Sequence, residues 1–168
     1  MKEKITTLSA AQFLTLLEEK QGNLKATKNL HIRGKVIFGG EYHFPIRLGK
    51  IIFSNEVCCG QATFLQGFHC GQARFKSNFR FNQAIFKGNI SYGNAVFERG
   101  VYYGVSHFDM EIDYADAIFE RDIDHEQAHF SVQSVILIGN CTFKGKKICR
   151  NRPELANKFL MKEFKIFN

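Results

Sequence analysis

The chain has 168 residues, of which 45% are hydrophobic and 18 are Phe, and it carries a formal net charge of +7. This length is typical of a single domain, and the apolar content is too high for an intrinsically disordered chain. Its five Cys, an odd number with no secretory signal before them, argue against a disulfide framework and favour reduced thiols in a cytoplasmic protein. No segment approaches the ~18 consecutive apolar residues of a membrane span, so we expect one soluble domain over residues 1–168.

The first expected element is a helix over residues 9–21, within an N-terminal helical cap of residues 1–29. Ser9 and Gln12 have the spacing of a capping box, and the apolar side chains of the segment lie on one helical face. Residues 30–50 alternate irregularly between apolar and polar types, which predicts an imperfect first coil of the repeat that follows.

Phe then stands at every eleventh position through eight successive copies of a repeat, at Phe53, Phe64, Phe75, Phe86, Phe97, Phe108, Phe119 and Phe130. Within each unit the apolar residues form pairs two positions apart, which is the alternation of a strand. An 11-residue period also fits a right-handed coiled coil, but this alternation and the frequent Gly argue against helix. We interpret each unit as two short strands joined by bends, which must stack on copies of itself as a β-solenoid.

Two 11-residue units per coil leave room for the aromatic side chains, whereas a coil of one unit would be too narrow for them. Each coil then consists of two units and has four sides, and residues separated by two units stack in interior columns. Two columns contain alternate Phe residues of the repeat. The other two are expected to contain Cys59, Phe81, Tyr103 and His125, and Cys70, Tyr92, Tyr114 and Ile136. The predicted fold class is an all-β, four-sided β-helix over residues 30–150, capped by short N- and C-terminal α-helices.

Several stretches of the repeat, such as Gln72–Phe75, Asn94–Phe97 and Ala115–Phe119, resemble the pentapeptide-repeat proteins. In that family a small residue stands two places before a central Leu or Phe, and the resemblance is strong over about residues 51–130. It implies a right-handed β-helix in which both positions point inward, and it says little about activity, because members share an architecture rather than one function. This chain departs from the family pattern because its inward centres alternate between a six-position and a five-position spacing, which predicts bulged corners.

The last expected element is a helix over residues 151–166, within the C-terminal region 151–168. Asn151 is placed to cap it, Pro153 lies in its first turn, and Leu155, Phe159, Leu160 and Phe164 form an apolar stripe. Helices at the ends of a solenoid cover unpaired strand edges and the exposed core. The stripe offers a second role, as the interface of a homodimer.

Acidic side chains gather at outward positions within less than one coil. This acidic belt consists of Asp109, Glu111, Asp113, Asp116, Glu120, Asp122, Asp124 and Glu126. Residues one coil apart in sequence lie one strand spacing from each other, so we expect ion pairs of Lys76 with Glu98 and of Lys87 with Asp109.

Basic side chains gather after the repeat. This basic end consists of Lys144, Lys146, Lys147, Arg150 and Arg152. Together with Lys25, Lys28, Arg33 and Lys35 near the N-terminus, it is a candidate for binding a phosphate backbone or an anionic surface. The simpler interpretation is a solvated terminus, because the basic end lacks the exposed aromatic residues that would stack on bases.

Histidines that could bind a metal lie near the acidic belt, at His107, His125 and His129, and His69 adjoins Cys70. No second pair of ligands has the spacing of a zinc site, so we predict no metal site. His125 takes a Tyr position of the repeat and is expected to be a neutral core residue.

The cysteines of the repeat are also better explained by packing than by catalysis. Cys59 and Cys70 fall at inward positions, and Cys58 is expected to be exposed as the neighbour of Cys59. The sequence contains no phosphate-binding loop and no nucleophile elbow. We therefore predict no catalytic residue, no cofactor and no enzymatic activity.

The function that these observations favour is a scaffold, a rigid and flat-sided rod that binds another protein. The resemblance suggests a second hypothesis, because some pentapeptide-repeat proteins are similar in shape to duplex DNA and inhibit or protect topoisomerases by mimicking it. That mimicry needs a negative face along the rod, whereas the acidic belt encircles one end of a net basic chain. A third hypothesis, not favoured, is binding of nucleic acid or an anionic surface through the basic ends. The acidic belt and the basic end are thus the candidate interaction surfaces.

Overall fold

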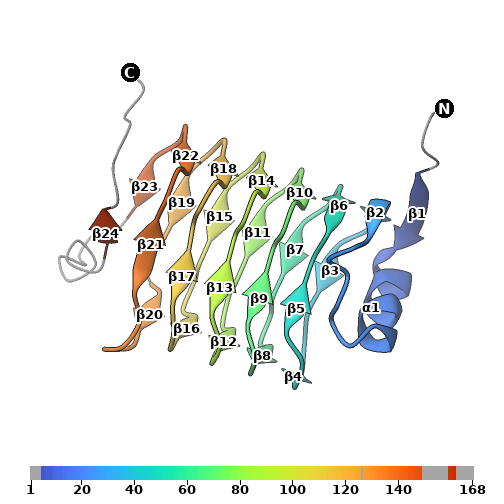
Figure 1. Ribbon diagram of the computed structural model, residues 1–168, viewed down its shortest axis with the longest axis horizontal. Coiled ribbons are helices and arrows are strands. Elements are labelled where there is room, and N and C mark those ends of the chain that lie inside the picture. The colour runs from blue at the N-terminus through green and yellow to red at the C-terminus, as the bar shows by residue number, and fades with distance from the viewer. Residues whose placement is uncertain (1–4, 126, 149–158, 162–168) are drawn as a thin grey trace.

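The computed structural model describes residues 5–125, 127–148 and 159–161. They form a parallel β-solenoid of about six coils with four sides and about 22 residues per turn (Figure 1). The chain visits the four sides in a fixed order, so each turn adds one strand to each of four parallel sheets. The predicted fold class is confirmed.

The sheets are numbered here in the order in which the chain first enters them. The first sheet contains β1 (Thr6–Ser9), β2 (Lys28–Arg33), β6 (Lys50–Phe53), β10 (Arg74–Phe75), β14 (Val96–Phe97), β18 (Ile118–Phe119) and β22 (Thr142–Phe143). The second contains β3 (Val36–Ile37), β7 (Val57–Cys58), β11 (Phe79–Arg80), β15 (Val101–Tyr102), β19 (Ile123–Asp124) and β23 (Lys147–Ile148).

The other two sheets close the coil. The third contains β4 (Glu41–Tyr42), β8 (Thr63–Phe64), β12 (Ile85–Phe86), β16 (His107–Phe108) and β20 (His129–Phe130). The fourth contains β5 (Ile46–Arg47), β9 (Phe68–His69), β13 (Ile90–Ser91), β17 (Ile112–Asp113), β21 (Ile136–Ile138) and β24 (Phe159–Met161).

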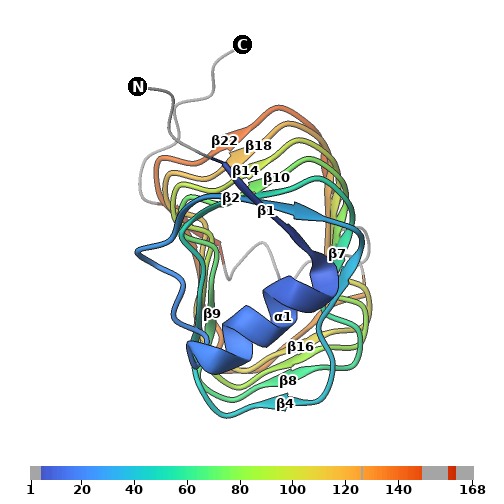
Figure 2. The same cartoon turned by 90° about the vertical axis from the view of Figure 1, so that its right-hand side faces the viewer.

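The solenoid is right-handed. Seen from its N-terminal end, the strands β7, β8, β9 and β10 succeed one another clockwise while the chain moves away from the viewer (Figure 2). This is the handedness that the resemblance to pentapeptide-repeat proteins implies, and it is the general preference of parallel crossover connections.

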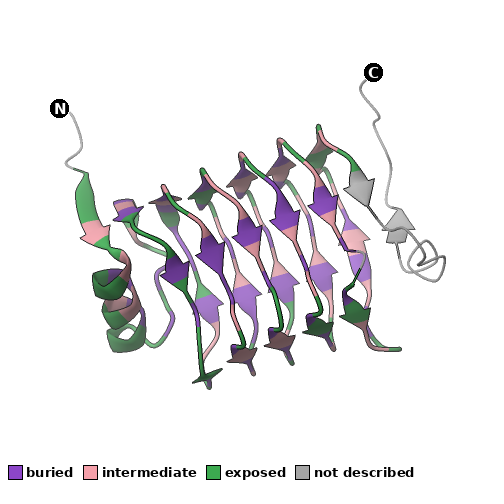
Figure 3. Ribbon diagram, turned by 180° about the vertical axis from the view of Figure 1, so that it is seen from behind, coloured by how far each residue is buried: buried purple, intermediate pink, exposed green. Residues whose placement is uncertain are grey.

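The interior consists of aromatic columns, as the regular spacing of Phe predicts. The rings of Phe53, Phe75, Phe97 and Phe119 stack with successive centroids 5.0, 4.7 and 4.9 Å apart. The rings of Phe64, Phe86, Phe108 and Phe130 stack at 4.7, 5.2 and 5.3 Å. These separations match the ~4.8 Å between neighbouring strands, because each ring projects from the same register position of successive coils. Every strand from β2 to β19 contains at least one buried residue (Figure 3).

The N-terminal end is covered by α1 (Ala10–Glu19), which crosses the open end of the coil (Figure 2). Ser9 and Gln12 form the predicted capping box. Phe13 and Leu17 are fully buried, and the ring centroid of Phe13 lies 5.3 Å from that of Phe53. The apolar face of the helix therefore extends the core. Strand β1, which precedes the helix and was not predicted from the sequence, pairs in parallel with β2.

One interior position differs from the prediction. Ile136 aligns with Ile112 rather than with Tyr114, because the sequence offset between paired strands grows by two positions after Phe130, which itself pairs with Phe108. The longer offset persists in the next two sheets, as the alignment of Phe119 with Phe143 shows. Two additional residues are taken up at the corner between β20 and β21, so the hydrophobic pattern is recovered without a change of face.

The expected C-terminal helix lies largely outside the described residues, and so does the homodimer interface proposed for it. In its described part the prediction is wrong, since Phe159–Met161 is strand β24, paired in parallel with β21. The backbone of β21 offers a row of donors and acceptors on that side, and an added strand satisfies them as a helix does not.

Candidate functional site

The corner between the third and fourth sheets exposes apolar side chains on two successive coils. Met110 follows Asp109 and Val132 follows Ser131, whose hydroxyl donates to the Asp109 carbonyl oxygen at 2.8 Å. Met110 and Val132 therefore occupy the same corner on successive coils, with 44% and 98% of their surfaces exposed. We call this pair the apolar corner.

The apolar corner coincides with the two additional residues of the last coil. A turn closes over residues 131–134, in which the Ser134 amide and hydroxyl both bind the Ser131 carbonyl oxygen, at 3.2 and 2.7 Å. Ser134 is buried, so the turn is anchored at its base while Val132 stands at its tip. An ordered turn therefore holds the apolar side chain of Val132 in solvent.

The acidic belt is less exposed than its sequence position suggests, because internal partners use several of its carboxylates. Asp109 pairs with Lys87 at 2.7 Å, as predicted, and Glu120 pairs with Lys144 at 2.9 Å. Two further members accept hydrogen bonds from backbone amides of their own or the next coil, at 2.8 Å each, namely Asp113 from Ala115 and Asp122 from Lys146. Glu126 lies outside the described residues. Glu111, Asp116 and Asp124 complete the described part of the belt.

The other predicted ion pair, of Lys76 with Glu98, is replaced by another pair. Glu98 binds the neighbouring Arg74 at 3.3 Å from its Nε. Arg74 and Lys76 both point outward from the first sheet one coil before Glu98, so register alone does not decide between them.

The basic end is only partly described. Lys144 is bound to Glu120, and Lys146 is exposed. The side chain of Lys147, and Arg150 and Arg152 altogether, lie outside what the structure describes.

The basic residues near the N-terminus are not all free for a ligand. Lys35 pairs with Glu56 at 2.7 Å, and Glu56 also accepts from Arg80 Nε at 2.8 Å. The hydrogen bond from Lys35 is the main cause that holds the pKa of Glu56 below its usual value, and Arg80 adds to it. Arg80 in turn lies over the ring of Tyr102, 4.5 Å from its centroid.

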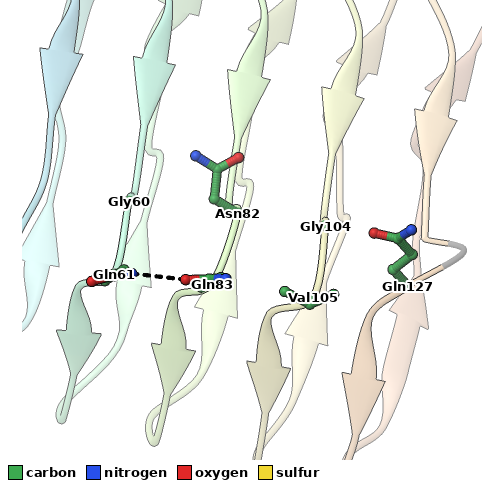
Figure 4. Close-up of a pocket in the computed structure, with 7 residues that line it drawn as sticks. All are labelled: Gly60, Gln61, Asn82, Gln83, Gly104, Val105 and Gln127. Atoms are coloured by element: carbon green, nitrogen blue, oxygen red, sulfur yellow. Dashed lines mark hydrogen bonds between the residues drawn. The ribbon is translucent and has the colours of Figure 1, made fainter.

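A shallow groove of about 450 Å³ runs along the corner between the second and third sheets (Figure 4). Its lining is uncharged and consists of Gly60, Gln61, Asn82, Gln83, Gly104, Val105 and Gln127. The Gln61 amide donates to Gln83 in the next coil at 2.8 Å, while Val105 takes the Gln position one coil later. The corner needs left-handed backbone, and Asn82 adopts it at φ 54° where neighbouring coils have Gly.

The thiols of the repeat are shielded. Cys59 and Cys70 are fully buried as predicted, and burial raises the pKa of both, well beyond the ordinary range of a thiol. Cys58, expected to be exposed, is 5% exposed because Asn82 of the next coil donates to its sulfur at 2.8 Å. Thiols that stay protonated and inaccessible are poor nucleophiles.

The histidines that the sequence places near the acidic belt do not form one site. His125 is buried in the core and His107 and His129 stack on the outside of the third sheet. In the described part of the chain, no group of three or more His, Cys, Asp and Glu side chains is arranged to hold a metal ion.

Three tyrosines that the repeat places inward bind one another, which their spacing in the sequence does not reveal. The hydroxyl of Tyr103 is hydrogen-bonded to those of Tyr92 and Tyr114, the latter at 2.5 Å, and Tyr114 is bound to His125 Nε2 at 2.5 Å. All four side chains are at most 1% exposed. Burial raises the pKa of Tyr92 and Tyr103 well above that of a free phenol. The chain of hydroxyls satisfies polar groups that would otherwise be costly inside an aromatic core.

Comparison with protein-family models, with curated proteins and with solved structures found no match. Within the described residues, no helix is long and apolar enough to cross a membrane.

Proposed function

We propose that this protein is a non-enzymatic scaffold that binds another protein, and that its docking surface is centred on the apolar corner. The observation that carries the proposal is the exposure of Met110 and Val132 at the place where the regular rhythm of the coils changes. In repeat proteins, insertions that interrupt the repeat commonly map to the binding face. Apolar side chains that are grouped at one exposed place are a mark of interaction sites.

The charges beside the apolar corner indicate the chemistry of the partner. Glu111 adjoins Met110, and Asp113 points outward from β17 on the neighbouring side. The partner is therefore a protein with an apolar pocket that receives Val132 and Met110, flanked by Lys or Arg side chains. The shape and inward pattern of the coils also support the proposal that the chain is a variant of the pentapeptide-repeat family.

The two other hypotheses have less support. Mimicry of DNA needs a regular array of free carboxylates, and Lys87 and Lys144 neutralise two members of the acidic belt. Binding of a phosphate backbone needs free cations, and two of the basic residues singled out for it, Lys35 and Lys144, are already in ion pairs. We propose neither.

The docking surface is tested with a double variant, Met110→Gln with Val132→Ser, which makes the apolar corner polar. The control is Ile37→Ser with Val105→Ser, which changes exposed apolar side chains (53% and 39%) at other parts of the solenoid. Proteins from a lysate retained on each immobilised chain are compared, and the affinity of each retained protein is then measured with purified components at low and at high salt.

We expect one or more proteins to bind the wild type and the control alike. The same proteins should bind the apolar-corner variant at least about tenfold more weakly, the loss of a central apolar contact. Binding should also weaken at higher salt, because acidic side chains flank the corner. Equal retention by all three chains would show that the corner is not the docking surface. Sedimentation of the chain alone tests whether the partner is a second copy of it. A wild-type dimer that the double variant abolishes would show that the apolar corner binds another copy of this chain and not a different protein.

A further inference from the structure

Two histidines project side by side from the outer face of the third sheet. His107 in β16 and His129 in β20 are paired in parallel register, with their neighbours Phe108 and Phe130 directed into the core. The imidazole rings are stacked, with centroids 4.7 Å apart and planes 12° from parallel. Both side chains are exposed, so solvent and ions reach them freely.

Both imidazoles are available as ligands. Within the described residues neither ring has a hydrogen-bond or ion-pair partner, whereas Asp109, the nearest acid in sequence to His107, is engaged by Lys87. His43, an exposed histidine near the N-terminal end, differs in this respect, because its Nε2 lies 3.1 Å from Glu41 Oε1. A neutral imidazole with an unused ring nitrogen is the commonest metal ligand in proteins.

The spacing suits a shared metal ion. Two nitrogens that each bind a Zn²⁺-sized ion at about 2.0–2.1 Å lie roughly 3 Å from each other. The centroids are 4.7 Å apart, but the rings are nearly parallel, so each must turn by roughly half the angle between two ligands of the ion before one nitrogen of each points at a shared metal. Both side chains are exposed, and their side-chain torsions can make this change. The register of β16 and β20 keeps the two Cα atoms in place, so metal binding requires changes in side-chain torsions and none in the backbone.

We propose that His107 and His129 form a two-histidine site for a divalent transition-metal ion of the class Zn²⁺, Ni²⁺ and Cu²⁺, with water completing its coordination. The nitrogen ligands favour these ions over Mg²⁺ and Ca²⁺, which require oxygen ligands. Sequence motifs do not reveal the site, because its two ligands are separated by a whole coil of the chain and meet only when that coil has closed.

The test uses the full chain without an affinity tag and Ni²⁺ as the probe, because Ni²⁺ binds imidazole and does not oxidise thiols. Binding is measured by titration calorimetry at a mildly alkaline pH, where imidazole is neutral, for the wild type, for His107→Gln, for His129→Gln and for the double variant. His43→Gln is the matched control, an exposed histidine on another coil. Mg²⁺ is titrated into the wild type for comparison.

We expect one Ni²⁺ per chain, affinity reduced at least about tenfold by either single substitution, and unchanged affinity in His43→Gln. The double variant should be little weaker than either single variant, because losing one ligand already abolishes chelation. Folding of each variant is checked by its unfolding midpoint, and surface substitutions here should leave it unchanged. Equal affinities in all five chains, or detectable binding of Mg²⁺ with a similar affinity, would overturn the proposal.

Discussion

Two regions of the solenoid are built from the same residue types and yet differ in the side chains that they expose. The first is the set of coils between β6 and β18, and the second is the coil that follows β20. In the former, paired residues keep one constant sequence offset, as from Phe75 to Phe97 and from Phe97 to Phe119, and every inward Phe is at most 1% exposed. In the latter, the offset is longer by two positions, Phe143 is half-buried, and Val132 stands almost wholly in solvent. Strict periodicity thus yields a fully buried core, whereas two additional residues expose Val132 and leave Phe143 less buried than the equivalent Phe residues.

The largest difference between the two regions is expected in the free energy of unfolding when one Phe ring is removed from each. Phe86→Ala should lower the free energy of unfolding by about 3–5 kcal/mol, because the ring stacks on Phe64 and Phe108 in a fully buried column and leaves a cavity. Phe143→Ala should cost about 1–2 kcal/mol, since its ring, which stacks on Phe119, is only half-buried. Guanidinium unfolding measures both.

The control for the regular region is Lys87→Ala, adjacent to Phe86. The Lys87 side chain is 54% exposed and its ion pair with Asp109 is on the surface, so its removal should change stability by about 0–1 kcal/mol. Similar losses for Phe86→Ala and Lys87→Ala would contradict the inward and outward assignment.

The hydrogen-bonded tyrosine hydroxyls in the core allow a test in which a single atom is removed. Tyr103→Phe removes one hydroxyl but leaves Tyr92 and Tyr114 with a lost partner each, so we expect a loss of about 1–3 kcal/mol. Tyr102→Phe, next in sequence but on the outside, should be nearly silent. Thermal unfolding of the two variants makes the comparison, and a larger effect at Tyr102 would show that the hydroxyl chain does not stabilise the core.

The smallest expected effect is a pH dependence from His69 of β9. Burial, and then the nearby Arg47, lower the pKa of His69 below 6.5 in the folded protein. The unfolded chain therefore binds the proton more readily, and stability should fall as the pH drops below about 6.5, levelling off once the folded-state pKa is passed. His69→Gln should flatten this part of the stability profile relative to His43→Gln. A profile that is unchanged in His69→Gln would assign the pH dependence to other groups.

The architecture follows from the sequence because its signal is repeated and one-dimensional. Phe64 and Phe86 are separated by two repeat units and meet in the core, so the equivalent positions along the repeat all report the same coil length. The change of register had a weaker signal, namely that the Phe after Phe130 is Phe143, two positions later than the repeat predicts. A single irregular interval near the end of a repeat does not by itself locate the additional residues.

The surface was less predictable, because outward side chains choose among several neighbours. Glu98 is within reach of two cations and binds Arg74. Cys58 alternates outward and is nevertheless covered by Asn82, a residue whose left-handed backbone places its amide over the preceding coil. The apolar corner depends on a turn whose conformation is set by hydrogen bonds between Ser131 and Ser134 rather than by periodicity.

Because the register is uniform, the length of the solenoid can change only in steps of one coil. Each turn adds one strand to every sheet and brings the chain back to the same position, about 4.8 Å further along. Duplication or loss of one whole coil within residues 53–119 would lengthen or shorten the rod by one step, adding or removing one member of each interior column while keeping the register of the sheets. The distance between the two ends, and hence between anything attached to them, is in this way encoded as a whole number of turns.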